Sequence, residues 1–441
     1  MLQLSGNQTS FINRASRRSV SDIFQRKNDL RNGQWLRLPN SYLVDTTKKI
    51  QQDNKNSILN DEDLGAYVSI SAPLHCIDGW TYLSRAVSSL IQGDFNTARH
   101  LGYYAELRGA ISILATEGIA ILGNDHFVID SNERCWRIPA SNGTHAIVWP
   151  VFEYWAKQTR AADLIGKIIT PYGIELKDWH TVFSSGSTLP AIAEDWLVSW
   201  GLDLSQLDSD HTARNEISYR PLKISTFPPV MPLEISAFVK EFWSLFSPSG
   251  TSRFNEVDRY LLNKSLQVAH NAFDGNRPYN ERVKLAVSTL FGSDKDPAVI
   301  QSFEQFLSVD QDTFVLREAS SNAPTDHPRH VYQLLSRASL LLRLATGASA
   351  DLILSAGISN SDFDFWWRRL GLDAGFWDSG NDPASPDELW LDIETSIMEV
   401  NSWMAQAVNP SIYKMHVDNL NAKHFWTLSG TERIAMWGMF R

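Results

Sequence analysis

The sequence predicts an all-α protein, and three observations support this fold class. Apolar residues recur at helical spacing along most of the chain, strict two-residue alternation is scarce, and Gly, Pro and polar residues separate the apolar segments. No fixed internal repeat is visible. At 441 residues the chain exceeds what one hydrophobic core usually requires, so we expect two helical domains preceded by an arm.

The first 65 residues are predicted to form a basic polar arm and linker. Residues 1–50 carry nine Lys and Arg against three Asp and Glu, although the whole chain has a net charge of -10. Such an acidic body disfavours sequence-independent binding to a nucleic-acid duplex, which depends on neutralising phosphates. Two alternatives remain for the arm. It is either a solvated or docked segment, or a contact for an acidic partner or nucleic acid.

Residues 66–250 are predicted to form the first helical domain. Two segments, 74–94 and 95–122, have the pattern of an αα-hairpin with a break at Gly93. Asn96 or Thr97 is the expected N-cap of the second helix, and Gly118 its C-cap. Further helices are expected at 145–169, interrupted near Pro150, and at 188–204 and 233–246.

Residues 251–441 are predicted to form a second, C-terminal helical domain, with the boundary near residue 250 in "SPSGTSRF". Helical patterns occur at 256–273, 279–292, 296–308 and 330–349. The last of these is apolar over most of its circumference, so we expect it to be central and buried.

The composition is that of an ordinary globular protein of a reducing compartment. The two cysteines, Cys76 and Cys135, lack the spacing of a metal site, which excludes a four-cysteine zinc site and a disulfide framework. We find no apolar run of transmembrane length and no signal-peptide pattern. We therefore expect a cytoplasmic protein without a membrane span.

Most chemical motifs are absent or weak. The sequence has no phosphate-binding loop, dinucleotide-binding fingerprint, zinc-protease motif or nucleophile elbow. The segment 184–190, "SSGSTLP", is expected to be a loop. His327 and His330 could share a metal, but Pro328 indicates a helix start that Asp326 caps, so we expect neither a metal nor another cofactor. The acidic, Trp-rich segment 362–394 is either a docking surface or a packed aromatic cluster with solvated carboxylates.

Two further stretches belong together. The first, "GYYAELRGAISILATEGIAILGNDHFVI" (102–129), resembles the signature helix of HEPN domains, with a Tyr-Tyr-Ala start, a stripe of small residues, a Gly break and a following His. The second, "ARNEISYRP" (213–221), resembles the other HEPN signature, in which an Arg, a polar residue and then a His lie at one helix end. Arg214, Asn215 and Tyr219 match those positions in order, and the resemblance covers roughly residues 75 to 247.

The resemblance implies a HEPN-like helical bundle that cleaves RNA without a metal. In such a site the ribose 2′-hydroxyl attacks the adjacent phosphate, an Arg stabilises the developing charge, and a His acts as general acid or base. Tyr219 replaces that His, and Tyr, with an ordinary pKa near 10, is a poor base at neutral pH. His211 lies about one helical turn before Arg214 and is the expected substitute, with Arg220 as a further substrate contact.

The family resemblance also implies a biological setting. HEPN proteins commonly act in phage defence and toxin–antitoxin modules, usually as dimers whose two motifs form one composite site. RNA and a second copy or another protein are thus the expected partners. The leading function is a ribonuclease or RNA-binding effector, and the alternative is a non-catalytic scaffold or sensor subunit of a multiprotein defence complex. In a purely structural alternative Asp208, Ser209 or Asp210 caps a short helix that ends by Arg220, because the residue before Pro221 avoids α geometry.

Overall fold

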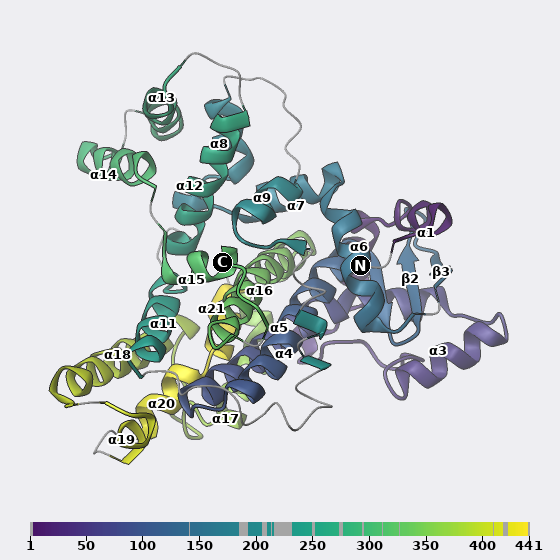
Figure 1. Cartoon of the computed structure of the whole chain (residues 1–441). Helices are drawn as coiled ribbons and strands as arrows, with labels where there is room; N and C mark the ends of the chain where they lie inside the picture. The colour runs from purple at the N-terminus through teal and green to yellow at the C-terminus, as the bar shows by residue number, and fades with distance from the viewer. Residues whose placement is uncertain are drawn as a thin grey trace.

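The computed structural model is predominantly helical, which confirms the predicted fold class. It describes residues 3–140, 142–184, 193–204, 210–212, 214–215, 232–248, 252–272, 277–292, 295–310, 312–325, 327–408, 410–417 and 422–439. Figure 1 shows long helices at the centre of the molecule. A small sheet and the N-terminal helices lie at one side of this centre, and shorter helices lie at the opposite side.

The elements have the following bounds. The α-helices are α1 (Gly6–Ile12), α2 (Arg17–Lys27), α3 (Thr46–Lys55), α4 (Asp61–Ile91), α5 (Phe95–Thr116), α6 (Thr144–Ala156), α7 (Thr159–Ile168), α8 (Leu176–Phe183), α9 (Ala193–Ser199), α11 (Pro232–Leu245), α12 (Asn255–Ala272), α13 (Tyr279–Phe291), α14 (Pro297–Ser308), α15 (Phe314–Ser320), α16 (His330–Ser355), α17 (Asp364–Asp373), α18 (Leu389–Gln406), α19 (Ile412–Val417), α20 (Ala422–Ser429) and α21 (Glu432–Gly438). Short 3₁₀ helices are η1 (Leu30–Asn32), η2 (Pro171–Gly173), η4 (Asn360–Phe363) and η5 (Pro386–Glu388). The strands are β1 (Ile119–Leu122), β2 (Asp125–Ile129) and β3 (Cys135–Ile138).

Helices α4 and α5 form the predicted αα-hairpin and pack along one another. The hairpin turns at Gly93, whose φ of 79° is in the left-handed region that Gly adopts without strain. The predicted N-cap of α5 is wrong, because Asp94 takes that position and its side chain accepts a hydrogen bond from the backbone N–H of Thr97. The helix ends at Thr116, followed by Gly118 with a φ of 81°, close to where the sequence predicts.

Helix α16 is central and buried, as predicted, and it packs against both helices of the hairpin. Its close approach to α5 depends on glycine. A Cβ atom at Gly102 would lie 2.1 Å from Leu334 Cδ2, and one at Gly109 would lie 3.3 Å from Leu341 Cβ. By length and composition α16 is the one helix among the described residues that could cross a membrane, but 89% of the relevant window is buried inside the protein.

A three-stranded antiparallel sheet, which the sequence did not predict, follows α5. Strand β1 pairs with β2, and β2 pairs with β3. Leu122 pairs with Asp125, so Gly123 and Asn124 form a two-residue hairpin loop, and Gly123 has a φ of 57°. Because Gly118 redirects the chain, the apolar residues after it form a buried strand.

The predicted interruption of the third helical region near Pro150 is also wrong. Helix α6 continues through Pro150, and the break falls at Lys157 and Gln158 before α7 begins. A proline inside a helix costs about 3 kcal/mol or more. The residues on both sides of it, Trp149 and Val151, are almost fully buried, so apolar packing offsets that cost.

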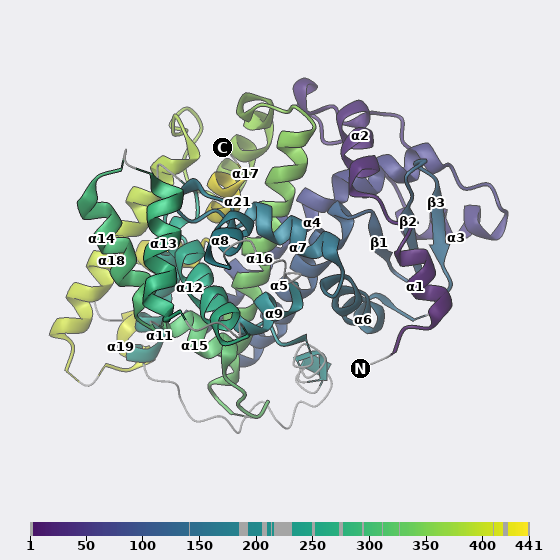
Figure 2. The same cartoon turned by 90° about the horizontal axis from the view of Figure 1, so that it is seen from above.

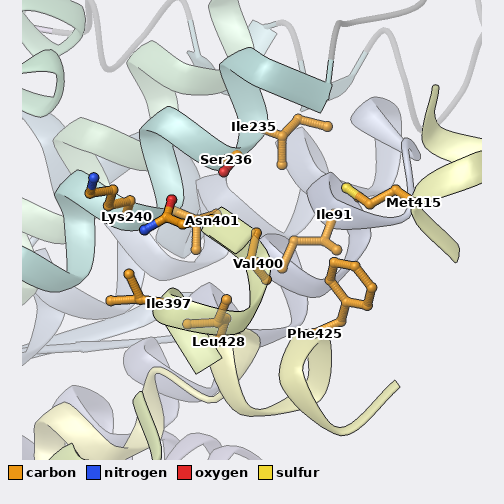
Figure 3. A pocket seen from close by; sticks show the side chains of 11 residues that line it. Ile91, Ile235, Ser236, Lys240, Ile397, Val400, Asn401, Met415, Phe425 and Leu428 are labelled. Carbon is orange, nitrogen blue, oxygen red and sulfur yellow. The ribbon is translucent and has the colours of Figure 1, made fainter. Parts of the chain in front are cut away.

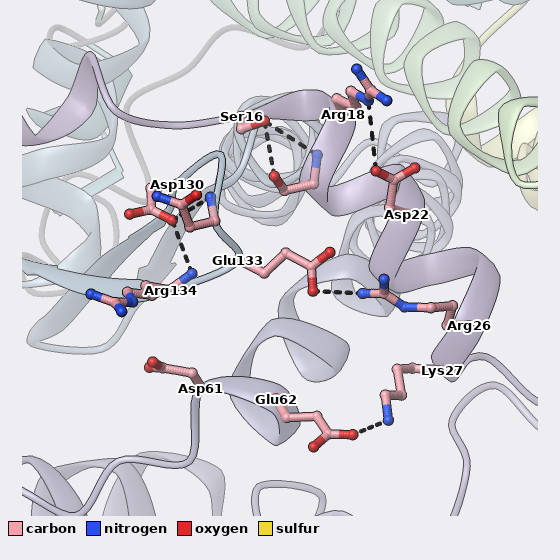
Figure 4. A network of polar contacts seen from close by, with 12 residues as sticks. Ser16, Arg18, Asp22, Arg26, Lys27, Asp61, Glu62, Asp130, Glu133 and Arg134 are labelled. Carbon is pink, nitrogen blue, oxygen red and sulfur yellow. Dashed lines mark hydrogen bonds and ion pairs between the residues drawn. The ribbon is translucent and has the colours of Figure 1, made fainter.

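The basic N-terminal segment is folded onto the body of the protein. Ile12 and Phe24 are fully buried, and basic side chains of α2 pair with acidic side chains outside the segment (Figure 4). Arg26 pairs with Glu133 on the β2–β3 turn at 2.5 Å, and Lys27 pairs with Glu62 at the start of α4. These two pairs engage two of the nine basic side chains of residues 1–50.

In the described part of the chain, the residues before and after the expected boundary at residue 250 contribute to one hydrophobic core. Helices α16 and α21 both pack against α4, although they lie C-terminal to the expected boundary (Figures 1 and 2). The Trp-rich segment forms a packed aromatic cluster in which Trp35 contacts the rings of Phe363, Phe365 and Trp366.

Candidate functional site

The candidate site is a group of side chains that we name the Tyr–His–Arg cluster: Tyr103, Tyr104, His145, His211 and Arg214. These residues come from α5, the first turn of α6 and the helical residues 210–212 and 214–215. Tyr103 is fully buried and the other four are partly exposed, so the cluster lies where the core meets the surface.

Three aromatic rings of the cluster stack on one another. The rings of His145 and His211 are nearly parallel, with an angle of 2° between them and their centroids 5.7 Å apart. Tyr103 stacks against both, at 5.6 Å from His145 and 5.7 Å from His211. Its hydroxyl lies 3.0 Å from His145 Nδ1. The buried phenol therefore holds both imidazoles in place.

Arg214 contacts the cluster through Tyr104 and Asn215. Its Nη1 donates to Asn215 Oδ1 at 2.9 Å, its Nη2 donates to the Tyr104 hydroxyl, and its guanidinium lies 5.2 Å from the centre of the Tyr104 ring. The buried Nε atom has no hydrogen-bond partner among the described residues. One donor of the guanidinium is thus buried without a partner in the described part of the chain, and the two Nη atoms are held inside the protein.

Asn215 determines which nitrogen of His211 carries a proton. Since Arg214 can only donate, the oxygen of the Asn215 amide faces it, and the amide nitrogen faces His211 Nε2 at 3.2 Å. An amide nitrogen donates, so Nε2 accepts and carries no proton in this arrangement. His211 Nε2 is therefore unprotonated, and its one lone pair accepts from the Asn215 amide, which a substrate hydroxyl would have to displace.

The electrostatics keep the other imidazoles neutral. Burial and then the positive charge of Arg214 lower the pKa of His145 to about 4. The same two causes lower the pKa of His100, which packs against Tyr104. Burial also raises the pKa of Tyr103, which stays protonated. At neutral pH Arg214 is then a cation beside neutral rings, an arrangement that attracts an anion.

A buried ion network lies behind the cluster and fixes residue 210. Asp210 is 1% exposed and receives Arg337 Nη2 at 2.6 Å and His330 Nε2 at 3.0 Å, both from α16. Arg337 Nε also lies 3.5 Å from Glu106 on α5. The network therefore joins α5, α16 and the start of the segment that carries His211 and Arg214.

The two carboxyl groups of this network titrate in opposite directions. Burial would raise the pKa of Asp210, but Arg337 and His330 together hold it below its ordinary value. Burial and the charge of Asp210 raise the pKa of Glu106 well above its ordinary value, and Arg337 only partly opposes them. Glu106 is thus the group that retains a proton.

We expect Glu106→Gln to increase stability relative to the wild type progressively as pH rises from 5 to 8. Above the ordinary pKa of 4.5, the unfolded wild type releases this proton while the folded protein keeps it, so unfolding becomes more favourable with rising pH. Glutamine cannot release a proton and removes that dependence. Urea unfolding at both pH values measures the difference, with Glu399→Gln at an exposed site as the control. A difference between variant and wild type that stays constant with pH would contradict the assignment.

The structure brings together three of the predicted site residues, His211, Arg214 and Asn215. Tyr219 and Arg220 lie outside the described residues. The candidate metal ligand His330 instead pairs with Asp210, and among the described residues no three His, Cys, Asp or Glu side chains group as metal ligands. Asp326 and most of the loop 184–190 also lie outside the described residues.

Sequence reasoning did not assign Tyr103, Tyr104 and His145 to the site. The two tyrosines stand in the "GYYAELRGA" motif, so their pairing with the second motif was an available signal. His145 has no comparable signal, because it joins the cluster only through the packing of α6 on α5.

A second concave feature is an apolar pocket near the end of α4, bordered by α11, α18, α19 and α20 (Figure 3). It encloses about 20 Å³, which is room for about one water molecule. Ser236, Lys240 and Asn401 are its only polar lining residues among those described, so it offers little chemistry.

No protein-family model, curated protein or solved structure matches the chain. The chemistry of the cluster therefore has to follow from its own residues.

Proposed function

We propose that this protein is an endoribonuclease that cleaves RNA at the Tyr–His–Arg cluster through the ribose 2′-hydroxyl. The observation that carries the proposal is the position of Arg214. It is a partly exposed cation with a buried Nε that is unpaired among the described residues, next to an Asn that accepts from Arg214 and donates to His211. A phosphodiester needs a cation for its oxygens and a proton acceptor for the attacking hydroxyl, and in this proposal Arg214 and His211 take those roles.

The reaction balances with these groups. The 2′-oxygen forms a bond to phosphorus, its proton passes to an imidazole, and the bond from phosphorus to the 5′-oxygen breaks. The leaving 5′-oxygen takes a proton from water, the hydroxide formed recovers the proton held by the imidazole, and the products are a 2′,3′-cyclic phosphate and a 5′-hydroxyl. Arg214 stabilises the charge on the phosphoryl oxygens with its planar donors. His211 is the proposed base, and Asn215 positions both side chains.

The resemblance to HEPN domains adds a context to this proposal. Two copies would bring two such sites together, and phage defence or a toxin–antitoxin module would use the cleavage. Tyr219 and Arg220, which follow the cluster in sequence, remain proposed contributors to proton transfer and substrate contact.

We expect intact cells to show RNA fragments with the wild-type protein and none with Arg214→Ala at matched protein levels. With purified protein, loss of Arg214 should lower the cleavage rate about 100- to 1000-fold, the range for removing one stabilising donor. Arg214→Lys should recover only part of the rate, since Lys lacks the planar fork. An oligonucleotide of the same sequence made with 2′-deoxyribose should not be cleaved, because it lacks the attacking 2′-hydroxyl.

Arg18→Ala is the matched control, because Arg18 is 92% exposed and pairs only with Asp22 in its own helix among the described residues. It should cleave like the wild type. Equal cleavage by Arg214→Ala and the wild type would exclude the cluster as the active site.

A non-catalytic scaffold or sensor subunit is the second candidate, and one observation favours it. Two of the Arg214 nitrogens already donate inside the cluster, to Asn215 and Tyr104, as they would in a structural contact. In that case Arg214→Ala should lower the melting temperature and RNA should stay intact with every variant. An Arg214→Ala variant that keeps the wild-type melting temperature but no longer cleaves RNA would instead favour the ribonuclease.

A further inference from the structure

A polar cleft of about 700 Å³ lies apart from the Tyr–His–Arg cluster and shares no lining residue with it. Its walls come from the end of α7, the residues before α12, the middle of α16, η5, the start of α18 and the end of α21. Cavities of about 300 to 1000 Å³ are the usual size of small-molecule sites. The cleft is thus large enough for a metabolite of nucleotide size.

One part of the cleft has the groups that bind a phosphate. Lys167 and Arg253 both line it, and their side chains are 40% and 26% exposed. The hydroxyls of Thr170 and Ser252 also line it and lie 3.3 Å apart. Two cations with neighbouring hydroxyls are the donors that phosphate oxygens accept from.

The charge balance limits how many anionic groups the ligand can have. Lys167 pairs with Asp351 at 2.6 Å, and Arg253 pairs with Asp387. Because each cation already has an acidic partner, the lining has little net charge. This favours a ligand with a single anionic group and disfavours a polyanion such as RNA, whose binding requires an excess of cations.

Another part of the cleft has a side chain that can stack on an aromatic ring. Trp390 in α18 lines the cleft and is partly exposed. An indole face stacks on a nucleobase. Asp387 in η5 lies three residues before Trp390 and keeps Arg253 at the same wall through their ion pair.

We propose that this cleft binds a nucleoside monophosphate, with the base at Trp390 and the phosphate at Lys167 and Arg253. The proposal does not depend on RNA cleavage, because it rests on different residues. It gives the protein a second site at which a small metabolite binds.

The test is calorimetric titration of the full chain with AMP, GMP, CMP and UMP, and separately with their nucleosides and with inorganic phosphate. At least one nucleotide should bind one site per chain. Its nucleoside and inorganic phosphate should each bind at least about tenfold more weakly, which corresponds to about 1.4 kcal/mol for the missing half of the ligand. No binding by any of the four nucleotides at millimolar concentration would overturn the proposal. Inorganic phosphate that binds as tightly as the nucleotides would also overturn it.

Variants locate the site. Arg253→Gln and Trp390→Leu should each weaken nucleotide binding at least about tenfold. Lys157→Gln and Trp426→Leu are matched controls at exposed positions outside the cleft lining and should bind like the wild type. If the Trp390→Leu variant does not fold, nucleotide binding by the Arg253→Gln variant tests the location of the site on its own. Wild-type affinity in a folded Arg253→Gln variant would place the nucleotide elsewhere and overturn the assignment.

Discussion

Replacing Arg337 with Met is expected to lower the free energy of unfolding by about 3–5 kcal/mol, the range for breaking a buried ion pair on one side. Arg337 is 1% exposed and is the cation between Asp210 and Glu106. Without it, two buried carboxyl groups from different segments face each other. Glu106 already retains its proton, so either Asp210 also takes up a proton or the packing of α5 on α16 opens, and both responses cost stability.

Urea unfolding of the Arg337→Met variant at neutral pH measures this loss. The triple variant Glu106→Gln, Asp210→Asn and Arg337→Met is the control, because it removes the charges together and leaves no uncompensated ion. It should recover most of the stability, as replacing a whole buried ion group often does. A triple variant no more stable than Arg337→Met would mean that the network contributes through packing rather than charge.

The second large effect is expected at Arg343, the other buried arginine of α16. Its Nε and Nη2 donate to the two oxygens of Asp258 at 2.9 and 2.6 Å, and Nη2 also donates to the carbonyl of Ile168 at 2.9 Å. Asp258 is fully buried, and burial raises its pKa despite Arg343. Arg343→Met should therefore cost about 3–5 kcal/mol of folding free energy.

Arg343→Lys should recover only part of that loss, because one ammonium cannot contact both carboxylate oxygens and the Ile168 carbonyl in the geometry of the planar fork. Thermal and urea unfolding of both variants measure the effect. Arg369→Met is the matched control, since Arg369 and its partner Asp373 are 71% and 54% exposed. That pair should contribute no more than about 1 kcal/mol. A loss at Arg343 as small as at Arg369 would contradict the assigned role.

The sequence predicts the helices well where local pattern and burial agree. The apolar stretch that becomes α16 and the Ala-rich hairpin of α4 and α5 follow from helical periodicity and from Gly93 and Gly118. The sheet was missed because the apolar residues after Gly118 are too few to show a strand period. A Gly-Asn pair between short apolar runs was nevertheless a hairpin signal, and Gly123 and Asn124 form that loop.

The candidate site was predictable only within its two sequence motifs. His211, Arg214 and Asn215 lie within one short segment, so their proximity follows from helical spacing. Asp210 was considered as a helix cap, yet its carboxylate pairs with Arg337 and His330. That partnership depends on the packing of α16, more than a hundred residues away in sequence, and local chemistry cannot show it.

The central position of α16 has a consequence for synthesis on the ribosome. The hairpin of α4 and α5 is translated roughly 200 residues before α16. At about 5–20 residues per second, the apolar face of the hairpin therefore stays uncovered for on the order of 10–40 seconds until α16 is synthesised. During that time the nascent chain exposes surface on which a chaperone can act. Slower translation between residues 116 and 330 should therefore increase aggregation, while a chain that has passed residue 355 should resist protease along α5.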